Sequence, residues 1–191
     1  MINKLNIPLV LLAGGKSSRM GQDKSLMPFG GYQTLIEYQY NKFLPYFSNI
    51  YISTKNKKID LPNIILDDNI DIYSPMIALK SILKNIQSEY IFILPVDTPL
   101  ITIDTINVLL DQKDNFDIVV AQSNDKIHNL CGVFAKRLLP TIEKYIQEDM
   151  HKINYLIKNV KTKIIQFSND DEFINLNTIE NYKNAVSLLK I

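Results

Sequence analysis

Residues 8–24 of the chain read PLVLLAGGKSSRMGQDK. Pro8–Leu12 is a continuous apolar run, which is typical of a strand buried on both faces. Gly14 and Gly15 follow directly, and they let the backbone turn tightly with no Cβ to keep a ligand away. A buried strand that runs into such a loop predicts an α/β domain that binds a ligand at the carboxyl end of this strand.

The glycine loop, Ala13–Lys24, also concentrates positive charge. Lys16, Arg19 and Lys24 lie within nine residues of one another, and hydroxyl side chains stand between them. Three cations in one loop repel one another unless an anion neutralises them, and a triphosphate does so. A solvated turn is the plainer interpretation, but such long turns are uncommon in compact domains unless they have a function. We therefore expect a phosphate-binding loop that is exposed before its ligand arrives.

The spacing of the glycines separates this loop from two common phosphate-binding motifs. Gly15 and Gly21 are one residue too far apart for a Walker A loop, and no Lys-Ser or Lys-Thr pair follows Gly21. The spacing of the dinucleotide-binding fingerprint is absent as well. The loop therefore indicates a nucleotide site of another type.

A second run of apolar residues delivers a carboxylate. Tyr90–Val96 predicts a buried strand, and Asp97-Thr98-Pro99 follows it. Because the carboxyl ends of parallel strands meet at one edge of a sheet, we expect Asp97 to lie near the glycine loop. A carboxylate that faces a triphosphate is a suitable ligand for Mg²⁺. The alternative is that Asp97 caps the helix that follows, since Asp-x-Pro is common at turns.

Strand and helix periodicities alternate along the rest of the chain. Strong helix starts include Thr34 with Glu37, Ser74 before Pro75, Thr102, and Asn177 with Glu180. We expect further strands at residues 49–53, 64–66, 117–121, 130–134 and 163–167, and further helices at 141–147 and 150–158. This alternation predicts a three-layer α/β/α domain with a mainly parallel sheet that spans residues 1–191.

Composition narrows the class of protein. The 191 residues suit one domain, and 21 basic against 20 acidic residues leave a formal net charge of +1. This balance predicts no binding to nucleic acid or to an anionic membrane. Cys131 is the single cysteine, which excludes an internal disulfide. The N-terminus has no signal segment and no membrane-spanning run, so we expect a cytoplasmic protein.

The run Leu12–Lys24 closely resembles the signature of the molybdenum-cofactor guanylyltransferases, Leu-Ala-Gly-Gly-x-Ser-x-Arg-Met-Gly-x-Asp-Lys. Cytidylyl-transferring relatives are more similar to Leu-Ala-Ala-Gly, so Gly14 favours the guanylyl group. The resemblance implies a Rossmann-like fold of the nucleotide-diphospho-sugar-transferase type. It also implies Mg²⁺ as cofactor, GTP bound by the N-terminal half, and a pterin substrate bound by the C-terminal half.

The resemblance assigns roles to the loop residues. Leu12, Ala13 and Gly14 would contact the guanine nucleotide, with Gly15 completing the binding loop. Catalysis would depend on Arg19 and Lys24, which neutralise the phosphates, and on Asp97, the Mg²⁺ ligand.

Other family positions are matched less uniquely. The nucleotide-contacting aspartate after the third strand corresponds to Asp67, with Asp71 in reserve. A polar contact after the second strand falls on Lys55 or Asn56. The usual Pro-Gly-Pro before the next helix is reduced here to Tyr73-Ser74-Pro75, which changes the expected shape of that loop.

The C-terminal half offers two further matches. His128 resembles a family histidine on the pterin side, although an isolated histidine is equally well explained as structural. Asn175 and Asn177 resemble the family's Asn-x-Asn-Thr. A helix cap explains Asn177, whereas Asn175 requires another explanation. His151 and Cys131 have no visible catalytic partner.

The activity implied by the resemblance is transfer of GMP from GTP to the terminal phosphate of molybdopterin, with release of pyrophosphate. GTP and molybdopterin are then the small-molecule partners, and molybdoenzymes or cofactor chaperones are candidate protein partners. Two alternatives remain open from the residues alone. The chain could be another nucleotidyltransferase that forms a molybdopterin cytosine dinucleotide, a sugar nucleotide or a CDP-alcohol, or it could be a catalytically silent nucleotide-binding domain.

Overall fold

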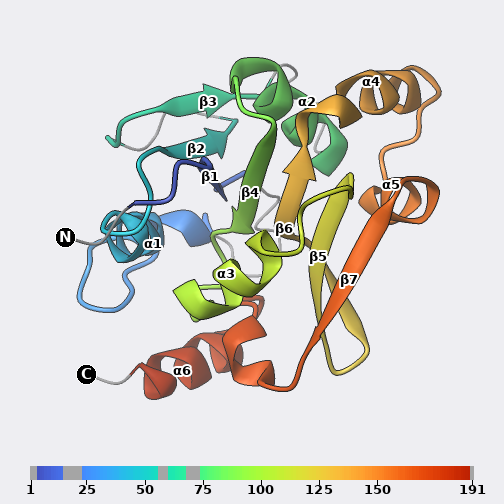
Figure 1. Cartoon of the computed structure of the whole chain (residues 1–191). Coiled ribbons are helices and arrows are strands. Elements are labelled where there is room, and N and C mark those ends of the chain that lie inside the picture. The colour runs from blue at the N-terminus through green and yellow to red at the C-terminus, as the bar shows by residue number, and fades with distance from the viewer. Residues whose placement is uncertain (1–3, 15–22, 56–59, 68–73, 190–191) are drawn as a thin grey trace.

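The computed structural model describes residues 4–14, 23–55, 60–67 and 74–189 (Figure 1). It contains a seven-stranded sheet in the order β3-β2-β1-β4-β6-β5-β7. The strands are β1 Leu9–Leu12, β2 Ile50–Thr54, β3 Ile64–Leu66, β4 Tyr90–Pro95, β5 Ile118–Ser123, β6 Lys126–Ala135 and β7 Thr162–Phe167. Only β6 runs against its neighbours within this sheet, so the mainly parallel arrangement is confirmed.

Helices cover both faces of the sheet and make the three expected layers. The helices are α1 Leu35–Phe43, α2 Pro75–Asn85, α3 Ile103–Leu110, α4 Leu139–Gln147, α5 Ile153–Asn159 and α6 Ile179–Leu188. Short 3-10 turns are η1 Lys24–Leu26, η2 Lys136–Leu138 and η3 Asp170–Phe173. The cores place α1, α3 and α6 on one face and α2, α4 and α5 on the other, as Figure 1 shows. Among the described residues, no helix is both long enough and apolar enough to cross a bilayer.

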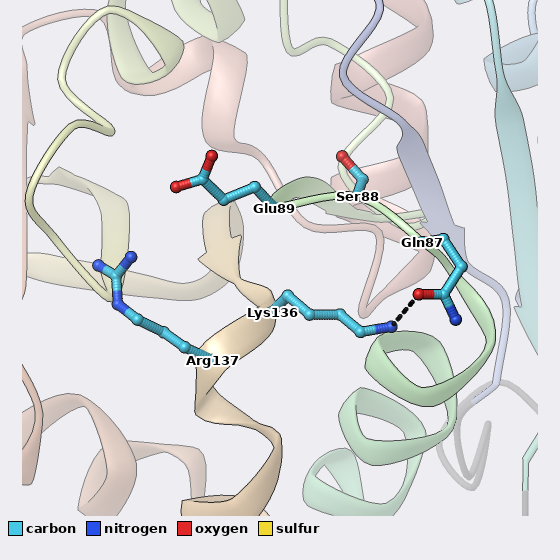
Figure 2. A pocket seen from close by; sticks show the side chains of 5 residues that line it. All are labelled: Gln87, Ser88, Glu89, Lys136 and Arg137. Atoms are coloured by element: carbon cyan, nitrogen blue, oxygen red, sulfur yellow. Dashed lines mark hydrogen bonds between the residues drawn. The ribbon is translucent and has the colours of Figure 1, made fainter.

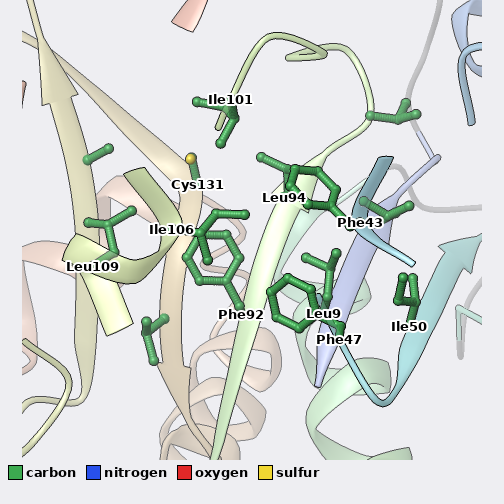
Figure 3. Close-up of a cluster of buried hydrophobic side chains, with 14 of the residues drawn as sticks. Leu9, Phe43, Phe47, Ile50, Phe92, Leu94, Ile101, Ile106, Leu109 and Cys131 are labelled. Atoms are coloured by element: carbon green, nitrogen blue, oxygen red, sulfur yellow. The ribbon is translucent and has the colours of Figure 1, made fainter. Parts of the chain in front are cut away.

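The apolar runs of the central strands fill both cores because successive side chains of a strand point to opposite faces. Phe92 and Leu94 of β4 pack with α1 and α3, whereas Ile91 and Ile93 pack with α2 and the other helices of its layer. Figure 3 shows the first of these cores, including the buried Cys131. Burial raises the pKa of the Cys131 thiol to about 12, so this side chain serves packing rather than chemistry.

The arrangement of β1 and β4 positions the candidate site. Starting from β1, the chain builds β2 and β3 on one side and then crosses to place β4 on the other. Leu12 and Pro95 pair at the carboxyl ends of these two strands, and Val96 N donates to Leu12 O at 3.0 Å. Such a reversal of strand order opens a crevice between the carboxyl ends of neighbouring strands.

The predicted helix starts are confirmed with one correction. Thr34 and Glu37 form a full capping box, and Ser74 and Thr102 cap α2 and α3. The cap of the last helix is Thr178, whose Oγ1 accepts from Asn181 N at 3.1 Å, so the prediction that Asn177 caps it was wrong.

The strand β6 is longer than the predicted 130–134, because its first half forms a hairpin with β5. Polar side chains at Lys126, His128 and Asn129 hide this half from a search for apolar runs. The register shifts between Val120, which pairs with Gly132, and Ala121, which pairs with His128, so the pairing is irregular at residues 129–131 of β6. The predicted strand was therefore correct in place but too short.

Candidate functional site

A pocket of about 340 Å³ lies where β1 and β4 end. Three segments contribute to its wall: the glycine loop, the turn of residues 95–99 that carries Asp97 (the Asp97 turn), and the segment before α6. The lining residues are Leu12, Ala13, Gly14, Asp23, Lys24, Ser25, Pro95, Val96, Asp97, Leu130, Asn175 and Asn177. The structure thus brings together the predicted residues Leu12, Ala13, Gly14, Lys24 and Asp97, and it adds the two asparagines.

Asp97 is the second residue after β4, and two partners from distant segments hold its carboxylate. Asn175 Nδ2 donates to Asp97 Oδ1 at 2.9 Å, and Lys24 Nζ lies 3.6 Å from Asp97 Oδ2. Burial raises the pKa of Asp97, while the charge of Lys24 and the hydrogen bond from Asn175 act in the opposite direction. Because Thr102 caps α3, the alternative that Asp97 is a helix cap is not realised.

Lys24 begins the 3-10 turn η1, which Asp23 caps through Ser25 N. Its ammonium donates to Asn177 Oδ1 at 2.6 Å, and the side chain is only 15% exposed. The expectation that Lys24 would be exposed was therefore wrong, because Asp97 and Asn177 draw the ammonium into the pocket. The hydrogen bond from Lys24 also makes Asn177 part of the site, which its prediction as a helix cap did not indicate.

Asp67 reaches the same region from the end of β3. It is buried, and Ser53 Oγ donates to Asp67 Oδ1 at 3.2 Å. A Cβ placed on Gly14 would lie 3.9 Å from Asp67 Oδ2, so Asp67 stands beside the start of the glycine loop. It does not belong to the lining of the 340 Å³ pocket, as far as the described residues go.

Several predicted positions lie outside the described residues. These are Gly15 and Arg19 of the glycine loop, Asn56 and Asp71. Lys55, the alternative to Asn56, is buried at the end of β2, and its backbone nitrogen would lie 3.8 Å from a Cβ on Gly14.

The oxygen atoms of the pocket are suitable ligands for Mg²⁺. Asp97 supplies one carboxylate, and the neighbouring Asn175 Oδ1 is buried with no hydrogen-bond partner among the described residues. No cluster of three His, Cys, Asp or Glu side chains that could hold a metal is found in the described part of the chain. Mg²⁺ does not require one, because it is commonly held by one or two carboxylates with substrate phosphate and water.

His128 lies in the hairpin half of β6 and not in the lining of this pocket. Its ring stacks on Phe173 with the centroids 4.5 Å apart, and its Nε2 is 2.9 Å from Ser123 Oγ. Burial, with Lys126 adding to its effect, lowers the pKa of His128 to about 4, against a weaker opposing effect of Asp170. The ring is therefore neutral near pH 7.

His151, for which the sequence shows no catalytic partner, has two polar contacts in the structure. Its Nδ1 is 3.0 Å from Ser74 Oγ, and its Nε2 is 3.1 Å from Asp149 Oδ1. Ser74 at the same time accepts from Met76 N as the cap of α2. The arrangement ties the start of α2 to the loop before α5, which is a structural role.

A larger concave surface, of about 530 Å³, lies at the opposite edge of the sheet (Figure 2). Gln87, Ser88 and Glu89 precede β4, and Lys136 and Arg137 follow β6. Lys136 Nζ donates to Gln87 Oε1 at 3.4 Å within this surface. Ligands of open α/β sheets bind at the carboxyl ends of the parallel strands, so the smaller pocket at Asp97 is the better candidate.

Comparisons with known proteins agree with this geometry. Residues 9–163 match the family model of the MobA-like NTP transferase domain. The chain is 38% identical over 192 aligned residues to a molybdenum cofactor guanylyltransferase of Campylobacter jejuni subsp. doylei, covering 99% of both chains. It is 38% identical to a protein of the same name from Helicobacter pylori, covering 97% of this chain and 94% of the relative.

A solved structure supports the fold independently. The molybdopterin-guanine dinucleotide biosynthesis protein A of Archaeoglobus fulgidus superimposes with a TM-score of 0.80 at 16% identity, covering 95% of this chain and 98% of that one. Together with the matched family model and the full-length relatives, the fold and the site lead to one assignment. This chain is a nucleotidyltransferase that belongs to the MobA-like NTP transferase family.

Proposed function

We propose that the chain transfers GMP from GTP to the terminal phosphate of molybdopterin and so forms the guanine dinucleotide of the molybdenum cofactor. The observation that carries this proposal is the meeting of Lys24, Asp97 and Asn175 at the glycine loop, in one pocket at the carboxyl ends of β1 and β4. The names of the full-length relatives from Campylobacter jejuni and Helicobacter pylori supply the substrates. A silent binding domain would not need this pairing of a cation and a carboxylate.

The reaction requires positioning and charge neutralisation more than proton transfer. A phosphate monoester has a second pKa of about 6, so the acceptor is largely ionised at neutral pH without a general base. One of its oxygens attacks the α-phosphorus of GTP, and the bond from that phosphorus to the bridging oxygen of the β-phosphate breaks. The electron pair leaves with pyrophosphate. In-line alignment of the attacking oxygen, the α-phosphorus and the leaving oxygen, and stabilisation of the added negative charge, are the main demands on the protein.

The residues of the pocket can meet these demands. Lys24 would neutralise the negative charge that develops on the leaving pyrophosphate, and Arg19 would supply a second positive charge. Asp97 would hold Mg²⁺, which when bound supplies positive charge to the phosphate oxygens. Asn175 would keep the carboxylate of Asp97 turned toward the pocket through its 2.9 Å hydrogen bond.

The nucleotide base would lie against the start of the glycine loop, on Leu12, Ala13 and Gly14. Among the described residues, Gly14 has no neighbour closer than 3.8 Å to the position of a Cβ, so these residues do not require glycine there. A ligand that approaches the backbone does require it. Asp67 stands beside this position and is suited to accept hydrogen bonds from the nucleotide.

The acceptor would bind to the C-terminal half of the same domain. A second pocket, of about 650 Å³, lies between the β5–β6 hairpin, α5 and β7, and cations and amides line part of it. It reaches Asn129, whereas the nucleotide pocket reaches the next residue, Leu130. The two pockets therefore border consecutive residues of β6.

The proposal is tested by incubating the purified protein with Mg²⁺, GTP and molybdopterin and by measuring both pyrophosphate and the dinucleotide product. Both should form in equal amounts, and neither should form when molybdopterin is omitted. Replacement of GTP by CTP should greatly reduce both. Faster turnover with CTP would assign the cytidylyl reaction instead, equal turnover would contradict the preference for guanine, and no turnover with either nucleotide would reject nucleotidyl transfer to molybdopterin.

A further inference from the structure

The turn that carries Asp97 has all its backbone carbonyls engaged. Pro95 O accepts from Thr98 N at 3.2 Å, and Asp97 O accepts from Leu176 N at 2.8 Å. The remaining carbonyls, those of Val96, Thr98 and Pro99, accept from side chains of a single helix, α1. This helix lies behind the turn and contributes nothing to the lining of the pocket among the described residues.

Gln39 makes two of these bonds. Its side-chain nitrogen Nε2 donates to Thr98 O at 3.0 Å and to Val96 O at 3.4 Å, and the residue is fully buried. One amide group thereby joins the carbonyls on either side of Asp97. Lys42, one helical turn further along α1, donates to Pro99 O at 2.8 Å.

The orientation of the Gln39 amide is set by these contacts. With nitrogen and oxygen exchanged, its oxygen would stand against two carbonyl oxygens, and both interactions would become repulsive. In the observed orientation, Oε1 is buried with no hydrogen-bond partner among the described residues. An apolar side chain would avoid that cost, so the two donated bonds explain why a glutamine stands in this core.

The same helix also determines where Lys24 lies. α1 packs against η1, the turn that begins with Lys24. A single rigid element thus supports both the cation and the carboxylate, whose Nζ and Oδ2 atoms are 3.6 Å apart. A shift of about 1 Å in such a pair can cost about 100-fold in rate.

We propose that Gln39 is a positioning residue, which fixes the Asp97 turn from behind through its two hydrogen bonds and so sets the place of the carboxylate in the pocket. The inference rests on the proposed function only for the identity of the reaction. It predicts that the Asp97 turn becomes more mobile when the two hydrogen bonds of Gln39 are lost, whichever substrate receives the nucleotide.

The test replaces Gln39 by Met, which keeps the length of the side chain and removes both donors, and by Glu, which sets an oxygen against the two carbonyls. Amide hydrogen exchange at Thr98 should become faster by about tenfold or more in Gln39→Met, since its bond to Pro95 O lies within the turn. The affinity for Mn²⁺ in the presence of GTP, measured from the electron spin resonance signal of free Mn²⁺, should fall by about tenfold. The kcat should fall by about 10- to 100-fold while KM for GTP stays within about twofold. Gln39→Glu should be affected more strongly in all three measurements.

Ile142→Val in the opposite core is the matched control, because it lowers stability without contact with the turn. It should keep wild-type exchange at Thr98, Mn²⁺ affinity and kcat. If Gln39→Met fails to fold, Lys42→Met removes the bond to Pro99 O at a partly buried position, together with the contacts of the ammonium with the Tyr38 and Phe43 rings, and should give smaller changes in the same direction. Wild-type exchange and Mn²⁺ affinity in a folded variant would overturn the inference. A wild-type enzyme that binds Mn²⁺ with GTP but forms no product would reject the proposed function and leave this test intact.

Discussion

Asp97 is a residue at which the effect of a substitution on folding can be separated from its effect on activity. In Asp97→Asn the amide oxygen can still accept from Asn175, but the negative charge beside Lys24 is lost. We expect the variant to fold, with a change in unfolding free energy of about 1 kcal/mol or less. Turnover should fall by about 10² or more, because a neutral amide is a poor ligand for a hard divalent cation.

The measurement is turnover as a function of Mg²⁺ for the wild type and Asp97→Asn side by side, with thermal unfolding of both as the control for folding. Added Mg²⁺ should restore activity only partly. Superimposable curves would remove Asp97 from the catalytic site and leave the pocket as a binding feature alone.

His128 gives a prediction about pH. Burial lowers its pKa to about 4 from an ordinary value of 6.5, so the folded state disfavours the proton that the unfolded chain accepts. The stability contributed by the neutral ring is complete above about pH 6.5 and is lost as the pH falls from there toward 4. Melting temperatures of the wild type should therefore drop between pH 7 and pH 4.5 more than those of His128→Phe, which keeps an aromatic ring over Phe173. Parallel curves for the two proteins would show that His128 titrates normally.

At the scale of elements, the close approach of β5 to β6 requires glycine at position 132. A Cβ on Gly132 would lie 2.0 Å from Val119 O and 2.9 Å from Val120 Cα, both of which are backbone atoms in the middle of the sheet. Gly132→Ala should therefore lower the free energy of unfolding by about 1–3 kcal/mol or more. Urea unfolding monitored by circular dichroism measures this loss, and Gly14→Ala is the matched control because its Cβ meets only ordinary contacts. Equal stability of the two variants would contradict the proposed clash.

Local sequence patterns predicted well those elements whose conformation depends on neighbouring residues. The capping box at Thr34 and the apolar run of β4 depend on neighbouring residues, and both were confirmed. The hairpin half of β6 was missed because its polar side chains carry no strand pattern, and its pairing partner in β5 decides its conformation. Asn177 was misassigned because Asn and Thr are both good caps, and only the bond from Lys24 distinguishes them.

At the scale of the whole molecule, the sequence could predict which edge of the sheet holds the site, but not which distant side chains contact one another there. Gly14 and Asp97 both follow buried strands, so their convergence follows from parallel pairing. The contact of Lys24 with Asn177 joins positions 153 residues apart, and the bonds of Gln39 to the Asp97 turn join positions nearly 60 apart. No periodicity in the sequence indicates such contacts, because they form only when the helices have packed against the sheet.

This joining of both ends of the chain predicts how nucleotide affects the entire fold. A nucleotide bound at Gly14 and Asp97 would contact the N-terminal strands and, through Asn175 and Asn177, the segment before α6. A ligand that binds only the folded state raises its stability by an amount that grows with the ratio of ligand concentration to Kd, by about 2.7 kcal/mol at 100 times Kd. GTP with Mg²⁺ should therefore raise the melting temperature of the whole domain in one cooperative transition.

The same measurement decides the base. Glycine at position 14 would leave the backbone open to a guanine, and a Cβ there would meet only ordinary contacts with the described residues, so we attribute the glycine to the nucleotide and not to the fold. GTP should thus protect the wild type more than CTP does at equal concentrations in a thermal-shift titration. In Gly14→Ala the melting temperature without ligand should be nearly unchanged, while protection by GTP should shrink because the new methyl group occupies the approach to the backbone. Equal or greater protection by CTP in the wild type would contradict the assignment of guanine, and undiminished protection by GTP in Gly14→Ala would place the base elsewhere in the pocket.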